Sequence, residues 1–415
     1  MSSEWTIATL GNSDKITHTD SNLLSARLFT EYTGEIDWCT RMRRDPSYKD
    51  EYTRTAISPA GALGAQLFLI DRTIRIESSS LRMGGIGGVG TEPANRGQGL
   101  ASRLMQDAIS YMEKEKFDVS VLFSIPADFY DRFGYITVLP EYTTTIAGLT
   151  KLNSLRKLPT HLKTRKLAKK DLQHLAALYE KTYNEVTGSC IRDRYHWNWL
   201  SDHPDFNGIV VIDHEQIVGY ALIRQETERL IVHEAGVEPS PPVHDALLRA
   251  LARRTLAAGI TELRLDLPGD FPFSRLCTLE HEAIQNVQVP RNRGGMAKVI
   301  NLISVMKKLE SVFSERVRQS QYGDIDRMIV IDTDIGSVLL HLHDGQVEAH
   351  PLDEDHPEPP DVAIPQTALT GLIFGLFYPA HILEVSGRPI PTDVLSLLNV
   401  LFPKRFPQIA WIDHF

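Results

Sequence analysis

The sequence predicts a mixed α+β protein built from three units, and three observations support this. A chain of 415 residues is longer than one hydrophobic core usually serves, so two or three domains are expected. Hydrophobic residues make up 42% and charged residues 23%, which is typical of a folded globular chain. Segments typical of strands and helices alternate, and their order in the first unit returns in the second. The expected units are 1–150, 151–295 and 296–415.

The first unit is expected to alternate strands and helices. Its predicted elements are a strand at 5–10, a helix at 21–36, strands at 64–70 and 72–79, a helix ending near 112, a strand at 118–125, and a short helix and strand within 127–138. Asp71 and Arg72 mark the predicted hairpin tip between the two central strands. The glycine-rich run at 83–90 is interpreted as relief of crowding on a strand that bends.

The second unit repeats this order, and the third does not. The second has a predicted helix at 166–186, a hairpin at 207–226, a strand at 229–240, a helix at 241–259 and a strand at 260–268. The third begins near 294, with strands at 327–333 and within 337–351 and helices within 364–377 and 391–403. It is therefore expected to be a smaller α+β unit.

Composition excludes several classes of partner. The formal net charge is −9 and no run of Lys and Arg could form a continuous basic surface, so no nucleic-acid partner is expected. Cys39, Cys190 and Cys277 are widely spaced without a metal-binding pattern, which predicts a reducing compartment and no metal site. No signal peptide or apolar run of about 18 residues is visible, so the prediction is a cytoplasmic protein without a membrane partner.

The stretch "NRGQGLASRL" predicts an anion site. It follows a strand and opens a helix, where unpaired backbone N–H groups and the positive end of the helix dipole favour a phosphate. Small residues at 97, 99 and 101 let the backbone approach a ligand, and Arg96 adds positive charge. A simple tight turn is the structural alternative. The pattern is neither the dinucleotide fingerprint nor a P-loop.

A second motif about 30 residues downstream identifies a family. Arg96-x-x-Gly99-x-Ala101, flanked by strands and followed by "FYDRFGY" (129–135), resembles the GNAT acyl-CoA transferase superfamily. The resemblance implies acetyl-CoA as co-substrate and Tyr130 at the reaction centre. It implies these positions for CoA binding: Val89, Thr91, Arg96, Gly97, Gln98, Gly99, Leu100, Ala101 and Ser124.

The whole layout resembles a narrower family. In the second unit the cradle position holds "EPSPPVHDALL" (238–248), whose prolines and missing glycines cannot hold a phosphate. Two tandem GNAT-type units and a third that resembles a sterol-carrier-protein fold are similar to the enhanced intracellular survival (Eis) acetyltransferases. That resemblance implies a silent second unit, Tyr130 as general acid, the C-terminal carboxylate of Phe415 as general base, and a homo-oligomer, commonly a hexamer.

The acceptor is less closely defined by the sequence. The resemblance implies a groove with acidic and aromatic side chains, with the candidates Glu35, Asp37, Trp38, Asp413 and His414. Such a groove suits the primary amine of a small cationic molecule, an aminoglycoside or a polyamine, although a neutral His414 weakens the attraction for a polycation. A protein lysine is an alternative acceptor. A non-catalytic sensor that binds CoA and a lipid is the alternative from another class.

Overall fold

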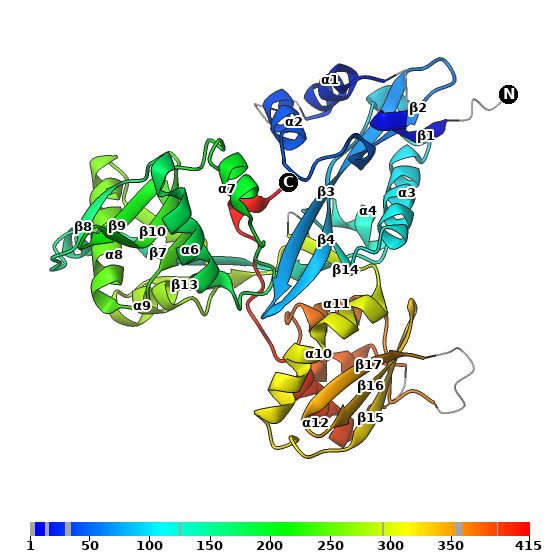
Figure 1. Cartoon of the computed structure of the whole chain (residues 1–415). Coiled ribbons are helices and arrows are strands. Elements are labelled where there is room, and N and C mark those ends of the chain that lie inside the picture. Colours follow the sequence, from blue (N-terminus) through cyan, green and yellow to red (C-terminus); the bar gives the residue numbers. More distant parts are fainter. Residues whose placement is uncertain are drawn as a thin grey trace.

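The computed structural model describes residues 5–12, 16–29, 35–123, 126–292, 294–352, 359–387 and 389–415. These residues form three lobes, and each lobe has its own β-sheet (Figure 1). The chain is a mixed α+β protein, as the sequence predicts, with two large mixed sheets and a smaller third one. The C-terminal segment runs back between the lobes and ends beside the first sheet (Figure 1).

The first sheet has helices on both faces. Its strand order is β1 (Thr6–Thr9), β2 (Thr53–Ile57), β3 (Leu63–Ile76), β4 (Ser79–Thr91), β5 (Val119–Phe123), β14 (Gly295–Val299) and β6 (Ile136–Leu139). Leu104 and Met105 of α3 (Leu100–Lys114) pack on one face beside Leu67. On the other face Ser21 of α1 (His18–Leu28) binds Gln66, and Trp38 of α2 (Glu35–Arg43) packs on Phe68.

Two predictions for this unit are wrong in detail. Asp71 and Arg72 do not form a hairpin tip, because β3 runs straight through them and turns at Glu77, whose φ is 50°. Each charged side chain has a partner of opposite charge: Arg82 of β4 donates to Asp71 at 2.7 Å, and Arg72 pairs with Asp45, which follows α2. In place of the single helix predicted at 21–36, the described residues form the separate helices α1 and α2.

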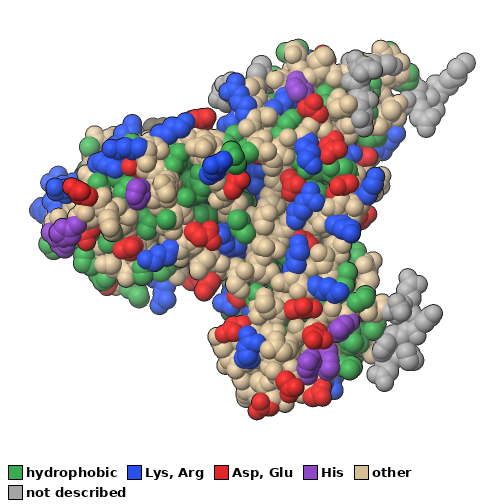
Figure 2. Space-filling view, in the orientation of Figure 1, with side chains coloured by type: hydrophobic (Ala, Val, Ile, Leu, Met, Phe, Trp, Pro, Cys, Tyr) green, Lys and Arg blue, Asp and Glu red, His purple; other side chains and the backbone are tan. Residues whose placement is uncertain are grey.

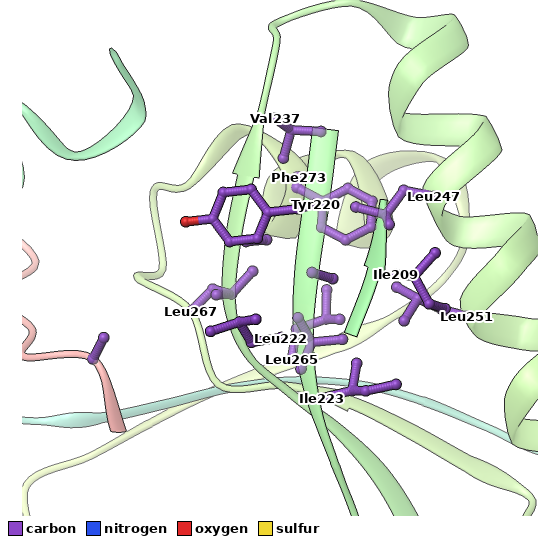
Figure 3. Packing of buried hydrophobic residues seen from close by; sticks show 14 of the residues in the cluster. Ile209, Tyr220, Leu222, Ile223, Val237, Leu247, Leu251, Leu265, Leu267 and Phe273 are labelled. Atoms are coloured by element: carbon purple, nitrogen blue, oxygen red, sulfur yellow. The ribbon is translucent and has the colours of Figure 1, made fainter. Parts of the chain in front are cut away.

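The second sheet encloses the largest hydrophobic cluster of the described residues. Its strand order is β13 (Ile284–Gln288), β7 (Glu141–Ala147), β12 (Glu262–Leu265), β11 (Arg229–Val237), β10 (Gln216–Gln225), β9 (Gly208–Asp213) and β8 (Lys163–Lys166). Figure 3 shows Leu251 of α8 (Pro241–Ala257) directed toward Ile209 of the sheet. The other helices of this lobe are α5 (Leu149–Leu155), α6 (Leu172–Tyr183), α7 (Arg194–Leu200) and α9 (Pro272–Glu280).

The first two lobes exchange strands, which corrects the predicted boundaries at 150 and 295. Strand β7, assigned from sequence to the first unit, pairs with β12 and β13 of the second sheet. Strand β14 lies between β5 and β6 of the first sheet, although its sequence begins the predicted third unit. Hydrophobic alternation predicts that a segment is a strand but not which sheet it joins, because the sequence of a short strand does not identify its pairing partners.

The third lobe is a four-stranded sheet with helices on one side. Its strand order is β17 (Gln346–Pro351), β16 (Gly336–His343), β15 (Arg327–Thr333) and β18 (Val362–Ala363), and its helices are α10 (Leu302–Arg318), α11 (Gln366–Ile373) and α12 (Thr392–Leu401). Leu309 and Phe313 of α10 pack on Leu340 and Val347. Among the described helices, none has the length and apolar character needed to cross a membrane.

Candidate active site

The entry to α3 has the backbone geometry of an anion cradle. Gly97 and Gly99 have φ of 76° and 73°, and Gly99 is the N-cap of the helix. A methyl group at either position would meet no heavy atom within 4 Å, so the space above the loop is open. The first backbone bond of the helix runs from Arg103 N to Gly99 O at 3.1 Å, so the N–H groups of Leu100 and Ala101 precede it. These groups are available to an anion.

Side chains around the cradle hold the loop in place. The indole N–H of Trp5 donates to Gln98 Oε1 at 2.8 Å, and Arg103 donates to the Trp5 carbonyl at 2.8 Å. Arg96 Nε donates to the carbonyl of Thr91 at 3.4 Å, which connects the loop to the end of β4. Of the predicted cradle, Arg96 and Gln98 therefore brace the loop, and Gly97 and Gly99 face open space.

Strands β4 and β5 part beside this loop. They pair only from Met83 to Ile86 on β4, although β4 continues to Thr91. The register of β4 with β3 shifts between Gln66 and Phe68, which leaves Gly88 and Val89 as a bulge, and Gly88 has a φ of 57°. The predicted residues Val89 and Thr91 lie on this bulged, diverging part of β4. Ser124 lies outside the described residues.

Tyr130 lies on the α3 side of the sheet. It belongs to α4 (Ala127–Asp131) and is 8% exposed, with the ring of Phe129 at 4.9 Å and that of Tyr135 at 6.4 Å. Burial raises the pKa of the Tyr130 phenol to about 12. The turn that follows is supported from the third lobe, because Gln366 of α11 donates to the Gly134 carbonyl at 2.9 Å.

Phe415 lies directly on β4, on the face opposite α3. Its ring atom Cζ is 2.5 Å from where a methyl group at Gly85 would lie, and its carboxyl carbon is 3.2 Å from the same position at Gly87. The Phe415 ring also meets Phe123 edge-on at 5.5 Å. The terminal residue thus occupies the region where β4 and β5 begin to part. Gly85 and Gly87 were not predicted as site residues. Glycines at alternate positions of a strand leave one face of it without side chains, and this pattern could have indicated the close contact with Phe415.

Trp38 reaches the same point from α2. Its Cη2 atom is 3.5 Å from the methyl position of Gly87, beside the carboxyl carbon of Phe415. Glu35 and Asp37 belong to the same helix, but their side chains lie outside the described residues. His414 stacks on Phe123 with the ring centres 3.7 Å apart, and burial lowers the pKa of its imidazole to about 4. His414 is therefore neutral at pH 7.

Asp413 does not line an acceptor groove, contrary to the expectation from sequence. Its side chain is fully buried and accepts from Arg192 Nη2 at 2.6 Å. Arg192 Nη1 also donates to Glu234 at 3.1 Å, and the guanidinium lies over the ring of Tyr179. This cluster fastens the C-terminal segment to the second lobe. Arg192 was missed because no local pattern connects it with a carboxylate more than 200 residues away.

The corresponding position in the second lobe differs from the cradle. Helix α8 begins at Pro241, with Ser240 as N-cap. Pro241 and Pro242 have no N–H to offer, so this helix entry lacks two of the donors that α3 presents.

Residues 26–138 match the model of the acetyltransferase (GNAT) domain. The first lobe carries a GNAT acetyltransferase domain. This match covers the helix entry, the diverging strands and Tyr130. It confirms the prediction that the protein is an acetyltransferase enzyme. A comparison with curated protein sequences gave no match.

Solved structures share the fold of the whole chain. A GCN5-related N-acetyltransferase from Anabaena variabilis has a TM-score of 0.77 at 16% identity, with 99% of this chain and 100% of that one covered. One from Kribbella flavida has a TM-score of 0.76 at 19% identity, covering 100% and 99%. Eis1 from Mycobacterium abscessus has a TM-score of 0.70 at 16% identity, covering 99% and 100%. The fold of the whole chain is thus similar to that of these three solved proteins.

Proposed function

We propose that the protein is an acetyl-CoA-dependent N-acetyltransferase that acts on a primary amine of a small cationic molecule. Tyr130 serves as general acid and the carboxylate of Phe415 as general base. The observation that carries this proposal is the approach of the Phe415 carboxyl carbon and the Trp38 ring to one point on β4, at Gly87. That point lies beside the opening between β4 and β5.

The loop before α3 fits a pyrophosphate. Gly97 and Gly99 have positive φ, and no heavy atom lies within 4 Å of a methyl group placed on either residue. The first N–H groups of a helix such as α3 suit an anion. The bulge at Gly88 and Val89 interrupts the β3 ladder, which frees backbone groups for the pantetheine arm. Acetyl-CoA, when bound there, supplies a thioester carbonyl as the electrophile.

The two proposed proton-transfer groups lie on opposite faces of the first sheet. Tyr130 packs in the cluster with α3, and the Phe415 ring covers Gly85 on the other face. Strands β4 and β5 pair only as far as Ile86 on β4, so we infer that the two substrates meet where these strands have parted. An amine that approaches along Trp38 and Phe415 would therefore meet a thioester that enters from the Tyr130 side.

The proton transfers follow from this placement. The Phe415 carboxylate accepts a proton from the substrate ammonium, directly or through water, and the free amine then attacks the thioester carbonyl. As the C–S bond breaks, Tyr130 donates a proton to the departing thiolate. Because burial raises the pKa of Tyr130 to about 12, the phenol stays protonated at pH 7. The same desolvation raises the pKa of the departing thiol of CoA. The pKa values of the Tyr130 phenol and of this thiol therefore stay close to each other.

Aromatic and neutral groups favour a cationic acceptor. The face of Trp38 attracts an ammonium group by a cation–π interaction, worth about 0.5–2 kcal/mol. His414 is neutral and does not repel one. A protein lysine offers the same ammonium, so an acceptor screen separates that alternative from a small molecule.

The test measures release of free thiol from acetyl-CoA with a panel of aminoglycosides, polyamines and lysine peptides. Wild type should acetylate small polyamines or aminoglycosides in preference to peptides. Tyr130→Phe should lower kcat by about 10²–10⁴-fold, because a general acid contributes that much, while the Kd for acetyl-CoA stays unchanged.

Two C-terminal variants isolate the carboxylate. Deletion of Phe415 removes both ring and carboxylate, whereas addition of one glycine after Phe415 keeps the ring and moves the carboxylate by about 3.5 Å. Both should lose turnover and still bind acetyl-CoA. Full activity of the extended chain would refute the terminal base, and absence of thiol release with every amine would favour a non-catalytic sensor.

A further inference from the structure

Histidines gather on the outer face of the third sheet. Along β16, Val338, Leu340 and Leu342 are buried, so the alternate residues His341 and His343 point away from the core. A spacing of two residues puts two side chains on one face of a strand, as a spacing of four does on a helix. These histidines take no part in the proposed acetyl transfer.

Strand β17 adds a carboxylate to the same face. Glu348 is the direct cross-strand partner of His341. The candidate ligand atoms of His341, His343 and Glu348 lie within 4.8 Å of one another. The two imidazole rings are 4.5 Å apart, and His343 Nε2 is 3.6 Å from Glu348 Oε1. Figure 2 shows purple histidines beside red acidic side chains on this lobe.

Two further side chains complete the surroundings. Asp326 lies 3.2 Å from His341 Nε2, so it can orient that ring and leave Nδ1 for an ion. His350 Nε2 lies 3.3 Å from Glu348 Oε2, at the edge of this group. Sites that bind zinc combine imidazole and carboxylate in this way, with a second carboxylate behind a ligating histidine.

We propose that His341, His343 and Glu348 form a binding site for a divalent transition-metal ion such as Zn²⁺. Imidazole ligands favour Zn²⁺, Ni²⁺ or Cu²⁺ over Mg²⁺ and Ca²⁺, which prefer oxygen. Ligands around Zn²⁺ lie about 3.4 Å apart, so the ion would draw these partly exposed side chains together by small rotations. The site belongs to the third lobe and is independent of the cradle at α3.

The experiment uses the full-length protein after chelator treatment, with ZnCl₂ titrated by calorimetry and CoCl₂ followed by visible absorption. Wild type should bind one equivalent of Zn²⁺, and Co²⁺ should give the absorption bands of a site with nitrogen ligands. His341→Ala/His343→Ala should bind Zn²⁺ at least about 100-fold more weakly, because it loses two ligands. His214→Ala, which removes an exposed histidine beside Asp213 of the second lobe, is the matched control.

Circular dichroism shows whether each variant is folded. If these histidines and carboxylates only form ordinary ion pairs, wild type, the double variant and the control should all bind Zn²⁺ equally weakly. That result, or a wild type that does not saturate with Zn²⁺, would overturn the metal site.

Discussion

At the scale of single residues, Arg192 holds the C-terminal segment against the second lobe through buried ion pairs. Its guanidinium and the carboxylates of Asp413 and Glu234 are fully buried together. The phenol of Tyr220 donates to Glu234 at 2.8 Å and helps to satisfy the extra negative charge. Because Asp413 is two residues from Phe415, this ion cluster also fixes where the terminal carboxylate can lie.

Arg192→Met tests this anchor. The change leaves two buried carboxylates without a counter-charge, so the free energy of unfolding should fall by about 3–5 kcal/mol. Where the chain still folds, kcat should fall while the Kd for acetyl-CoA stays constant. Urea unfolding and steady-state kinetics measure the two effects, and Arg194→Met, at an exposed neighbour, is the control. Wild-type kcat in a folded Arg192→Met variant would contradict a positioning role.

Gly85→Ala tests the contact between β4 and the terminal residue. The added methyl group would lie 2.5 Å from Phe415 Cζ, so the ring must move off the strand. Turnover should fall at least about tenfold, because a misplaced catalytic group lowers the rate steeply. Gly387→Ala, where a methyl group meets no heavy atom within 4 Å, should keep wild-type kcat. Equal kcat for both variants would show that the ring position does not matter.

At the scale of elements, two helices in the described part of the first two lobes have an N-cap glycine at positive φ. Gly99 caps α3 and Gly148 caps α5, with φ of 73° and 103°, and a methyl group would enter open space at both. Only the first adjoins diverging strands and a GNAT motif. Comparing substitutions at Gly99 and Gly148 therefore distinguishes an effect of backbone strain, expected at both, from an effect on ligand binding, expected only at Gly99.

Gly99→Ala and Gly148→Ala should each destabilise the fold, by about 1–3 kcal/mol, because both residues have a positive φ that favours glycine. Only Gly99→Ala should also raise the KM for acetyl-CoA, since its methyl group takes up phosphate space. Thermal unfolding and initial rates at varied acetyl-CoA measure this. An equal change of KM in both variants would argue against the cradle.

The sequence predicted some elements well and others poorly, for physical reasons. Local periodicity and turn residues predicted the helix that begins after Gly99 and the strands on either side of it. The structure contains this helix and these strands. The hairpin tip at Asp71-Arg72 was wrong because distant partners, Arg82 and Asp45, neutralise these charges inside a strand. The anchoring role of Asp413 likewise depends on Arg192, a long-range contact that no local pattern reveals.

At the scale of the whole molecule, buried histidines of the second lobe and of the C-terminal segment are neutral. Burial lowers the pKa of His233 on β11 and of His414 to about 4. His203 before β9 has the same shift for the same cause. Each is uncharged in the folded protein at pH 7.

The predicted hexamer and cytoplasmic location stay predictions, which light scattering and fractionation can test.

These histidines predict a loss of stability in mild acid. Their folded pKa values lie below the unfolded value of about 6.5, so the stabilisation is complete above pH 6.5 and is lost as the pH falls toward 4. His233, which is 2% exposed, accounts for up to about 3 kcal/mol. Urea unfolding between pH 7.5 and 4.5 should show this decline, and His233→Gln should flatten it. A wild-type free energy independent of pH in this range would contradict the assignment.

The exchange of β7 and β14 has a consequence for the order in which the protein is made. Strand β6 is held in the first sheet through β14, which leaves the ribosome only after the entire second lobe has been synthesised. Until then β5 and β6 present unpaired edges, a state prone to wrong association. The acetyltransferase domain is therefore completed late in translation, and a fragment ending at residue 150 would be a poor substitute for it.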